Sequence, residues 1–372
     1  MALTQSSRAL MALLTTATLF APTIAAAERT ITYANGLSAN HVTNRVAVQP
    51  FAKAVEEATG GSVKFQVLTD GTLVSLRDAL PSIRDAVADM TMVVDFYNPN
   101  ELKTNVILTE LSLLGEDAVA MTGAVNEMAI TACPGCAADA DANNMKILGI
   151  YASTPYKLLC TKKIIGLDDF KGLRIRATGA WAGLVEAFGA TPVNMATSEQ
   201  YEGLQRGQID CSLANLSALT NFGIIDVVKY VVDYPLGTFD GSMFLTINTD
   251  TWDSLTEAEK TAIRDNIPAA VADQVHASLQ EDVAARSAAE AKGIEFVPAG
   301  QDLIDAFKAK QENEVARAVE LGNSRGVEDP KALIDSFRTI IAKWTGLSAT
   351  IGDDPAKFAA ALRSEVYDKM PD

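Results

Sequence analysis

The side chains best suited to bind a ligand lie at the ends of predicted strands between residues 171 and 215. Arg176 stands near the end of an alternating stretch at 173–177, and Asn215 comes just past another predicted strand at 209–213. Because ligands of open α/β sheets collect at the carboxyl ends of the strands, we expect this guanidinium and this amide to face a ligand. The arginine fork can donate two parallel charge-assisted hydrogen bonds to a carboxylate or a sulfonate. An asparagine can both donate and accept, which suits a hydroxyl or a second acid oxygen.

The elements between these two side chains carry their own signals. Helical spacing at 181–188 ends at Gly189, and a short strand is predicted at 190–193. Thr197-Ser-Glu-Gln200 then predicts a capped start for a second helix, which Gly207 closes. The stretch therefore consists of consecutive βα units that position Arg176 and Asn215.

Four motifs in this order resemble the DctP-type substrate-binding proteins of tripartite ATP-independent periplasmic (TRAP) transporters. They are Lys171-Gly-Leu-Arg-Ile-Arg176, Gly189-Ala-Thr-Pro-Val193, the Tyr201-x-x-Leu-Gln-x-Gly207 helix and Gly207-Gln-Ile-Asp210. The resemblance implies a two-lobed α/β periplasmic-binding-protein fold with discontinuous domains and a long bracing helix. It also implies a small organic anion as ligand and selects Arg176 over Arg174, which strand alternation places on the same side. No cofactor, metal or catalytic residue is expected.

Further candidate contacts come from the same resemblance. Lys157 stands where many relatives carry a second arginine, and Tyr156 is the alternative contact at that place. The aromatic ring of Trp181 is placed to cover an apolar part of the ligand, although ordinary packing is the commoner role of a tryptophan. The complete candidate set is Arg176, Asn215, Lys157, Tyr156, Trp181, Asn40, His41, Asp95, Tyr97 and Phe239.

The predicted lobes exchange chain, so neither is a continuous segment. Lobe I is expected to contain 28–153 and 241–280, and lobe II to contain 154–240 and 281–372 with the C-terminal helices. A capping box at Thr256–Glu259 starts a helix, and Pro268 is expected to break it or to begin a fresh helix that runs to Lys292. That second helix would be roughly 37 Å long, enough to brace both lobes.

The amino terminus and the net charge indicate an exported protein. Arg8, an apolar run at 9–20 and Ala25-Ala-Ala27 are typical of a secretory signal that is cleaved near Ala27. The apolar run is too short to span a bilayer, and no second candidate span is found. A net charge of −16 argues against nucleic acid or an anionic membrane as partner. We expect a monomeric periplasmic protein.

Four cysteines in an exported chain favour disulfides. Cys133-Pro-Gly-Cys136 fits a redox motif, half of a metal site or a small closed loop. A redox motif should open a helix behind a strand, whereas this one follows a helical run and precedes a predicted polar loop, so a local structural disulfide is favoured. The resemblance places Cys160 and Cys211 side by side on neighbouring strands near the cleft. We expect that they pair, with buried free thiols as the alternative.

The function implied by the resemblance is a receptor that hands its ligand to TRAP permease membrane subunits. The ligand is expected to be a carboxylate, with a sulfonate as alternative, and Lys157 in place of arginine makes a C4-dicarboxylate less expected. The rival hypotheses are a periplasmic enzyme, either a hydrolase or a thiol oxidoreductase using Cys133 and Cys136, and a binding protein that serves a sensor. The chain has no glycine-rich phosphate loop and no histidine-rich metal spacing, which disfavours the enzymes.

Overall fold

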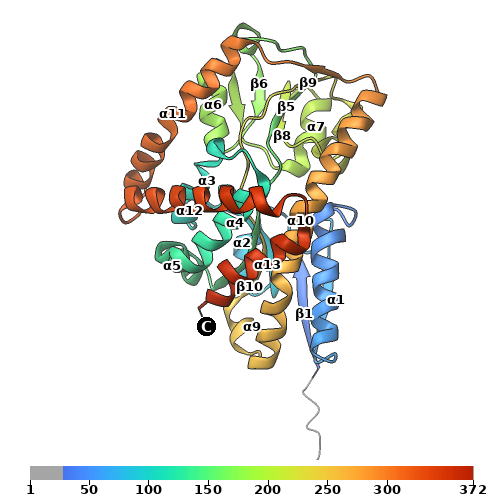
Figure 1. Ribbon diagram of the computed structural model, residues 1–372. Coiled ribbons are helices and arrows are strands. Elements are labelled where there is room, and N and C mark those ends of the chain that lie inside the picture. Colours follow the sequence, from blue (N-terminus) through green and yellow to red (C-terminus); the bar gives the residue numbers. More distant parts are fainter. Residues whose placement is uncertain (1–27, 372) are drawn as a thin grey trace, which may run out of the picture.

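Two β-sheets, one in each of two lobes, organise residues 28–371, the residues that this computed structural model describes (Figure 1). We call the part built on the first sheet lobe I and the part built on the second sheet lobe II. The architecture confirms the predicted two-lobed α/β fold with a long helix. The predicted signal at 1–27, with its cleavage site near Ala27, lies outside the described residues.

The sheet of lobe I has the strand order β2-β1-β3-β10-β4. The strands β1, β2 and β3 run parallel, whereas β10 returns from lobe II and pairs antiparallel with β3 and β4. The β3 sequence Met-Thr-Met-Val-Val is buried throughout, as expected for a central strand that is covered on both faces. These strands are β1 (Arg29–Ala34), β2 (Val63–Leu68), β3 (Met90–Val94), β4 (Met145–Tyr151) and β10 (Ser242–Asn248).

The sheet of lobe II has the order β11-β9-β5-β8-β6-β7. The strands β7, β6 and β8 are parallel neighbours, so their carboxyl ends meet at one edge of the sheet, where Arg176 and Asn215 stand. The strands are β5 (Lys157–Cys160), β6 (Arg174–Arg176), β7 (Thr191–Val193), β8 (Cys211–Ala214), β9 (Tyr230–Val232) and β11 (Glu295–Val297).

Shorter helices connect the strands and cover the sheets. The α-helices are α1 (Gln49–Ala58), α2 (Ala79–Arg84), α3 (Lys103–Thr109), α4 (Ala118–Glu127), α5 (Pro134–Ala142), α6 (Ala180–Ala187), α7 (Gln200–Gln205), α8 (Ala218–Asn221) and α9 (Thr249–Asp253). Single turns of 3-10 or π-helix are η1 (Thr43–Val48), η2 (Asp95–Tyr97), η3 (Ser112–Leu114), η4 (Met128–Ala132), η5 (Leu167–Phe170), η6 (Thr197–Glu199), η7 (Ile224–Asp226) and η8 (Tyr367–Lys369).

The long helix α10 (Glu257–Ala291) runs along one side of the molecule from lobe I to lobe II (Figure 1). It starts at the predicted capping box, in which the Thr256 hydroxyl and the Glu259 carboxylate bond each other's backbone N–H groups. The break expected at Pro268 is wrong. Helix α10 continues through the proline and contains 35 residues in all. Packing of α10 against α1, η1 and β4 offsets the hydrogen bond that the proline cannot donate. Its length is about 52 Å at 1.5 Å per residue, longer than predicted.

Three further helices follow β11. They are α11 (Gln301–Ser324), α12 (Pro330–Ile351) and α13 (Pro355–Glu365). Helix α12 packs on α4 of lobe I, and α13 packs on the lobe I half of α10, while α11 reaches from α3 to α6. Trp344 of α12 lies directly over Gly123 of α4, where a Cβ atom would come within 2.1 Å of the indole. Helix α12 thus packs on α4, which lies more than two hundred residues earlier in the sequence. Local sequence patterns do not reveal such a contact.

Both predicted disulfides are present. Cys160 and Cys211 stand directly opposite each other on β5 and β8, with their Cα atoms 4.1 Å apart. Cys133 and Cys136 are also bonded, but they open helix α5 and do not lead into the predicted polar loop. Both of these sulfur-bearing side chains are buried. Within residues 28–371, no helix combines the length and apolar character that crossing a membrane requires.

Candidate ligand-binding site

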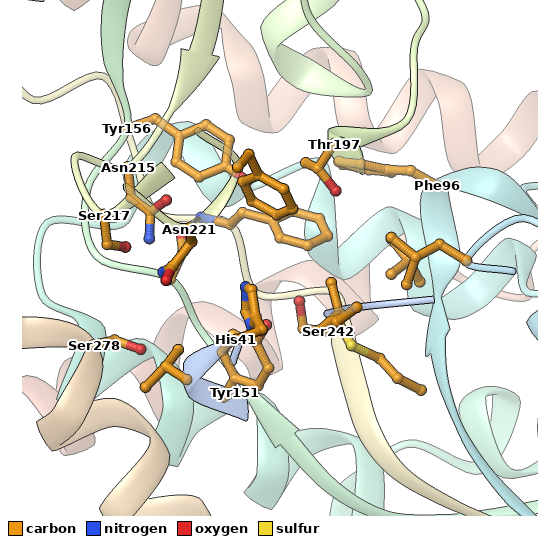
Figure 2. A pocket seen from close by; sticks show the side chains of 18 of the residues that line it. His41, Phe96, Tyr151, Tyr156, Thr197, Asn215, Ser217, Asn221, Ser242 and Ser278 are labelled. Atoms are coloured by element: carbon orange, nitrogen blue, oxygen red, sulfur yellow. Dashed lines mark hydrogen bonds between the residues drawn. The ribbon is translucent and has the colours of Figure 1, made fainter. Parts of the chain in front are cut away.

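A cavity of about 90 Å³ lies between the lobes at the carboxyl ends of β6 and β8 (Figure 2). This volume is several times the roughly 10–15 Å³ that one water molecule needs. Six aromatic side chains from both lobes line it, together with serine, threonine, asparagine and glutamine side chains. The aromatic residues are Phe96, Tyr97, Tyr151, Tyr156, Phe222 and Phe239. The cavity therefore suits a compact molecule with an apolar body and a few polar groups.

Arg176 is the one arginine or lysine among the described residues that line the cavity, and no aspartate or glutamate lines it. It ends β6 and is 3% exposed. Its Nε donates to the carbonyl of Met195 at 3.0 Å, and one terminal nitrogen donates to the carbonyl of Leu213 at 3.1 Å. Within residues 28–371, no carboxylate forms an ion pair with this guanidinium. Since a buried cation is costly without a counter-charge, the site is prepared for an anion.

Arg174, two residues earlier on the same strand, has a different environment. Its side chain is 49% exposed and lies 3.7 Å from a carboxylate oxygen of Asp210. It also donates to the carbonyl of Gly207. This arginine is paired, solvated and outside the cavity lining.

Asn215 follows β8 and lines the cavity beside Ser217 and Asn221 (Figure 2). Tyr156 lines it as well, and burial raises the pKa of this phenol to about 12 while Arg176 acts in the opposite direction. The tyrosine ring stacks on Trp181 with ring centroids 4.7 Å apart, and the indole N–H donates to the carbonyl of Leu236 at 2.6 Å. Trp181 therefore supports the wall of the cavity from behind.

His41 lines the lobe I side of the cavity and is 8% exposed. Burial lowers the pKa of His41 to about 4, and the charge of Arg45 acts in the same direction. Its Nδ1 accepts the backbone N–H of Thr43 at 3.2 Å, so the proton of the neutral ring sits on Nε2. The histidine thus offers one neutral hydrogen-bond donor.

Six of the ten candidate residues line the cavity: Arg176, Asn215, Tyr156, His41, Tyr97 and Phe239. Trp181 and three others do not. Lys157 donates to Asp233 at 2.6 Å, and Arg286 binds the same carboxylate, so this lysine is already paired. Asn40 is exposed on the surface, and Asp95 is buried beneath the cavity wall.

Several lining residues were missed from the sequence. Tyr151 ends β4, and its position at the carboxyl end of a strand was a usable signal. Gln274 and Ser278 lie one turn apart on α10 and also line the cavity. Two polar residues on an otherwise apolar helix face were the available clue for them.

Asp95 and Asp240 form a buried carboxyl pair directly behind the cavity wall. Asp95 follows β3 and Asp240 precedes β10, which pairs with β3, so the two groups lie on adjoining strand ends. Burial raises the pKa of Asp95 to about 7 and that of Asp240 to about 8, and the charge of Asp95 contributes to the second shift. Ser112 donates to one oxygen of Asp240 at 2.7 Å, and no described residue bonds the other.

Replacing Asp240 by asparagine is expected to flatten the dependence of stability on pH. A carboxyl whose pKa is raised by folding holds its proton in the folded state, so its contribution to stability is full below about pH 4 and is lost as the pH rises towards 8. Denaturant unfolding should show the variant gaining on the order of 3 kcal/mol over the parent chain between pH 5 and pH 8. The exposed Asp253→Asn change is the control. Parallel pH profiles for D240N and the parent would contradict the assignment.

The chain belongs to the bacterial extracellular solute-binding proteins of family 7 (DctP), whose family model matches residues 33–320. This confirms the resemblance found in residues 171–215. Members of this family are solute-binding proteins.

Known proteins resemble the chain at modest sequence identity. A solute-binding protein of Verminephrobacter eiseniae is 25% identical over 247 residues, which are 64% of this chain and 71% of that protein. A TRAP periplasmic solute-binding protein of Bordetella bronchiseptica, solved with (R)- and (S)-mandelate, matches with a TM-score of 0.72 at 24% identity, covering 85% of this chain and 99% of that one. A TRAP solute-binding protein of Rhodoferax ferrireducens, solved with copurified benzoate, matches with a TM-score of 0.76 at 19% identity, covering 86% and 99%.

Proposed function

We propose that the protein is an extracytoplasmic receptor that captures a small organic monocarboxylate between its lobes and delivers it to TRAP permease membrane subunits. The observation that carries this proposal is the buried, unpaired Arg176 at the wall of an aromatic cavity. A sulfonate would satisfy the same guanidinium and is the second ligand class to test. The protein works as a monomer in the periplasm, after cleavage near Ala27.

The charge of the cavity supports one acid group on the ligand. Lys157, which a second acid group would require, is bound to Asp233 and lies outside the lining. The aromatic lining supports an apolar and preferably aromatic body. The mandelate and benzoate bound by two structural relatives are consistent with that choice.

The receptor is favoured over an oxidoreductase acting through Cys133 and Cys136. Reactive cysteines are partly exposed, whereas these two are 4% and 0% exposed. Converting both to alanine should leave ligand binding intact if the protein is a receptor and should abolish all activity if it is an oxidoreductase.

Ligand binding is proposed to favour a closed arrangement of lobe I (28–153 and 241–280) against lobe II. Glu281 on α10 supports this coupling because its carboxylate holds both lobes. One oxygen accepts from Arg45 of lobe I at 2.7 Å, and the other accepts from Asn221 of lobe II at 2.8 Å. Asn221 also lines the cavity, so its side chain lies next to the ligand position and is part of the bridge through Glu281. A ligand that contacts both lobes shifts the population towards the closed form.

Replacing Glu281 by glutamine should weaken ligand binding about threefold to tenfold, because a partly exposed ion pair and one bridging hydrogen bond are lost. The matched control is Glu290→Gln on the same helix, whose partner Arg286 is a neighbour on that helix. Isothermal titration calorimetry should show weaker binding for E281Q alone. Equal affinities for E281Q and the parent would show that the Glu281 bridge does not contribute to ligand binding.

The proposed function is tested by screening the mature protein, unfolded and refolded to remove copurified ligand, against organic acids and sulfonates. Aromatic monocarboxylates such as benzoate, phenylacetate and mandelate are expected to raise the melting temperature, because a ligand bound only by the folded state stabilises it. Neutral analogues such as benzamide should have no effect. A protein stabilised equally by acids and their amides would not be the receptor proposed.

A further inference from the structure

One residue of the cavity lining carries a buried hydrogen-bond acceptor that no described residue satisfies. Gln274 is 0% exposed and lines the cavity from α10. Among residues 28–371, none donates a hydrogen bond to its side-chain oxygen, Oε1. A buried polar atom left without a partner costs about 1–3 kcal/mol, so such atoms in binding sites are expected to meet a ligand.

The hydrogen bonds of Ser278 determine which end of the Gln274 amide is free. The Ser278 hydroxyl donates to the backbone carbonyl of Gln274 at 2.9 Å and accepts from the amide nitrogen Nε2 at 3.1 Å. If the amide were turned around, its oxygen would face a hydroxyl whose proton is already used. The nitrogen is therefore the end bound by Ser278, and the free end is the acceptor.

The groups around this acceptor indicate which kind of hydrogen-bond donor a ligand would present to it. Helix α10 packs against η1, next to His41, and Figure 2 shows Ser278 and His41 on the lower side of the cavity, with Asn215 on the upper side. His41 offers a neutral N–H, and Tyr151 and Ser242 contribute hydroxyl groups to the lining. No aspartate or glutamate of the described residues lines the cavity, so nothing there compensates a ligand ammonium group. A neutral hydroxyl, which donates and accepts, fits both Gln274 and His41.

We propose that the ligand is a hydroxylated aromatic carboxylate and that Gln274 is the residue that selects its hydroxyl group. The carboxylate binds Arg176 in lobe II, and the hydroxyl group donates to Gln274 Oε1 in lobe I. One ligand then contacts both lobes through polar groups at separate places, with its ring between the aromatic walls. This inference rests on the proposed function, because it takes the carboxylate site at Arg176 as given.

The test compares matched acids that differ only at one ring position. Calorimetry measures Kd for benzoate and phenylacetate, for their 3- and 4-hydroxy derivatives, and for the corresponding methyl derivatives, which have similar size but no donor. At least one hydroxy acid is expected to bind about tenfold or more tightly than its methyl counterpart, as loss of one buried hydrogen bond predicts. In Gln274→Met, a substitution of similar size, this preference should fall to less than about threefold. A cooperative thermal unfolding transition of the unliganded variant, at a temperature close to that of the parent, shows that the variant is folded.

Gln280→Met is the matched control, since Gln280 lies on the exposed face of the same helix. This variant should retain the full preference for the hydroxy acid. If the acids bind but no pair shows a preference, or if Gln274→Met keeps the preference, the inference is wrong and the proposed function stands. If no carboxylate of the series binds at all, the aromatic carboxylate receptor itself is wrong, and this inference falls with it.

Discussion

Replacing Arg176 by alanine is expected to abolish measurable binding of aromatic carboxylates. The arginine fork supplies two charge-assisted hydrogen bonds worth about 1.5–3 kcal/mol each, so affinity should fall roughly 10²–10⁴-fold. Calorimetry should show no saturable heat, and the acid should no longer raise the melting temperature. Arg176→Lys keeps the charge but not the fork and should give an intermediate affinity.

The matched control is Arg174→Ala, which removes the same side chain from the same strand. Arg174 is half exposed and bonded to Asp210 and Gly207, so its loss should leave ligand binding within about twofold of the parent. Strand alternation alone does not distinguish the two arginines, but their surroundings in the fold do. Retained binding in R176A, or an equal loss in both variants, would contradict the assignment of the carboxylate site.

Replacing Gly179 by alanine is expected to weaken binding roughly 10–100-fold, the second largest effect, because it forces the lobes apart. Gly179 lies in lobe II just before α6, and an added Cβ would come within 2.2 Å of the Phe96 ring of lobe I. Its φ of 54° adds a backbone cost of about 1–2 kcal/mol for any other residue. Calorimetry should show the loss of affinity, and small-angle scattering with ligand should show a more extended molecule than the parent.

Gly207→Ala separates the steric effect from the backbone effect. Gly207 also has a positive φ, 64°, but nothing lies within 4 Å of the position of its Cβ. It should lose stability like G179A while keeping its affinity for ligand. Adding Phe96→Ala to G179A removes the clash and should recover part of the closure. If G207A lost affinity as much as G179A, contact between Gly179 and Phe96 would not be the cause.

The local parts of the fold and site were predictable because their signals lie within a few residues of each other. The βα units around Arg176 and the capping box at Thr256 follow from alternation, glycine stops and side-chain caps. The place of Asn215 follows from the rule that ligands meet the ends of parallel strands.

What was not predictable depends on contacts between distant parts of the chain. Helix α10 continues through Pro268 because tertiary packing outweighs a local propensity. Lys157 forms an ion pair with Asp233, which lies 76 residues later in the sequence. The side-chain oxygen of Gln274 is recognised as lacking a hydrogen-bond partner only from the fold, where Ser278 binds the amide nitrogen.

The most direct test of the account is a crystal structure of the refolded protein with a bound aromatic carboxylate. The account predicts both carboxylate oxygens within hydrogen-bonding distance, about 2.7–3.1 Å, of the Arg176 guanidinium, with the ring between the aromatic walls of the two lobes. An acid bound elsewhere, with Arg176 facing only protein carbonyls and water, would contradict it.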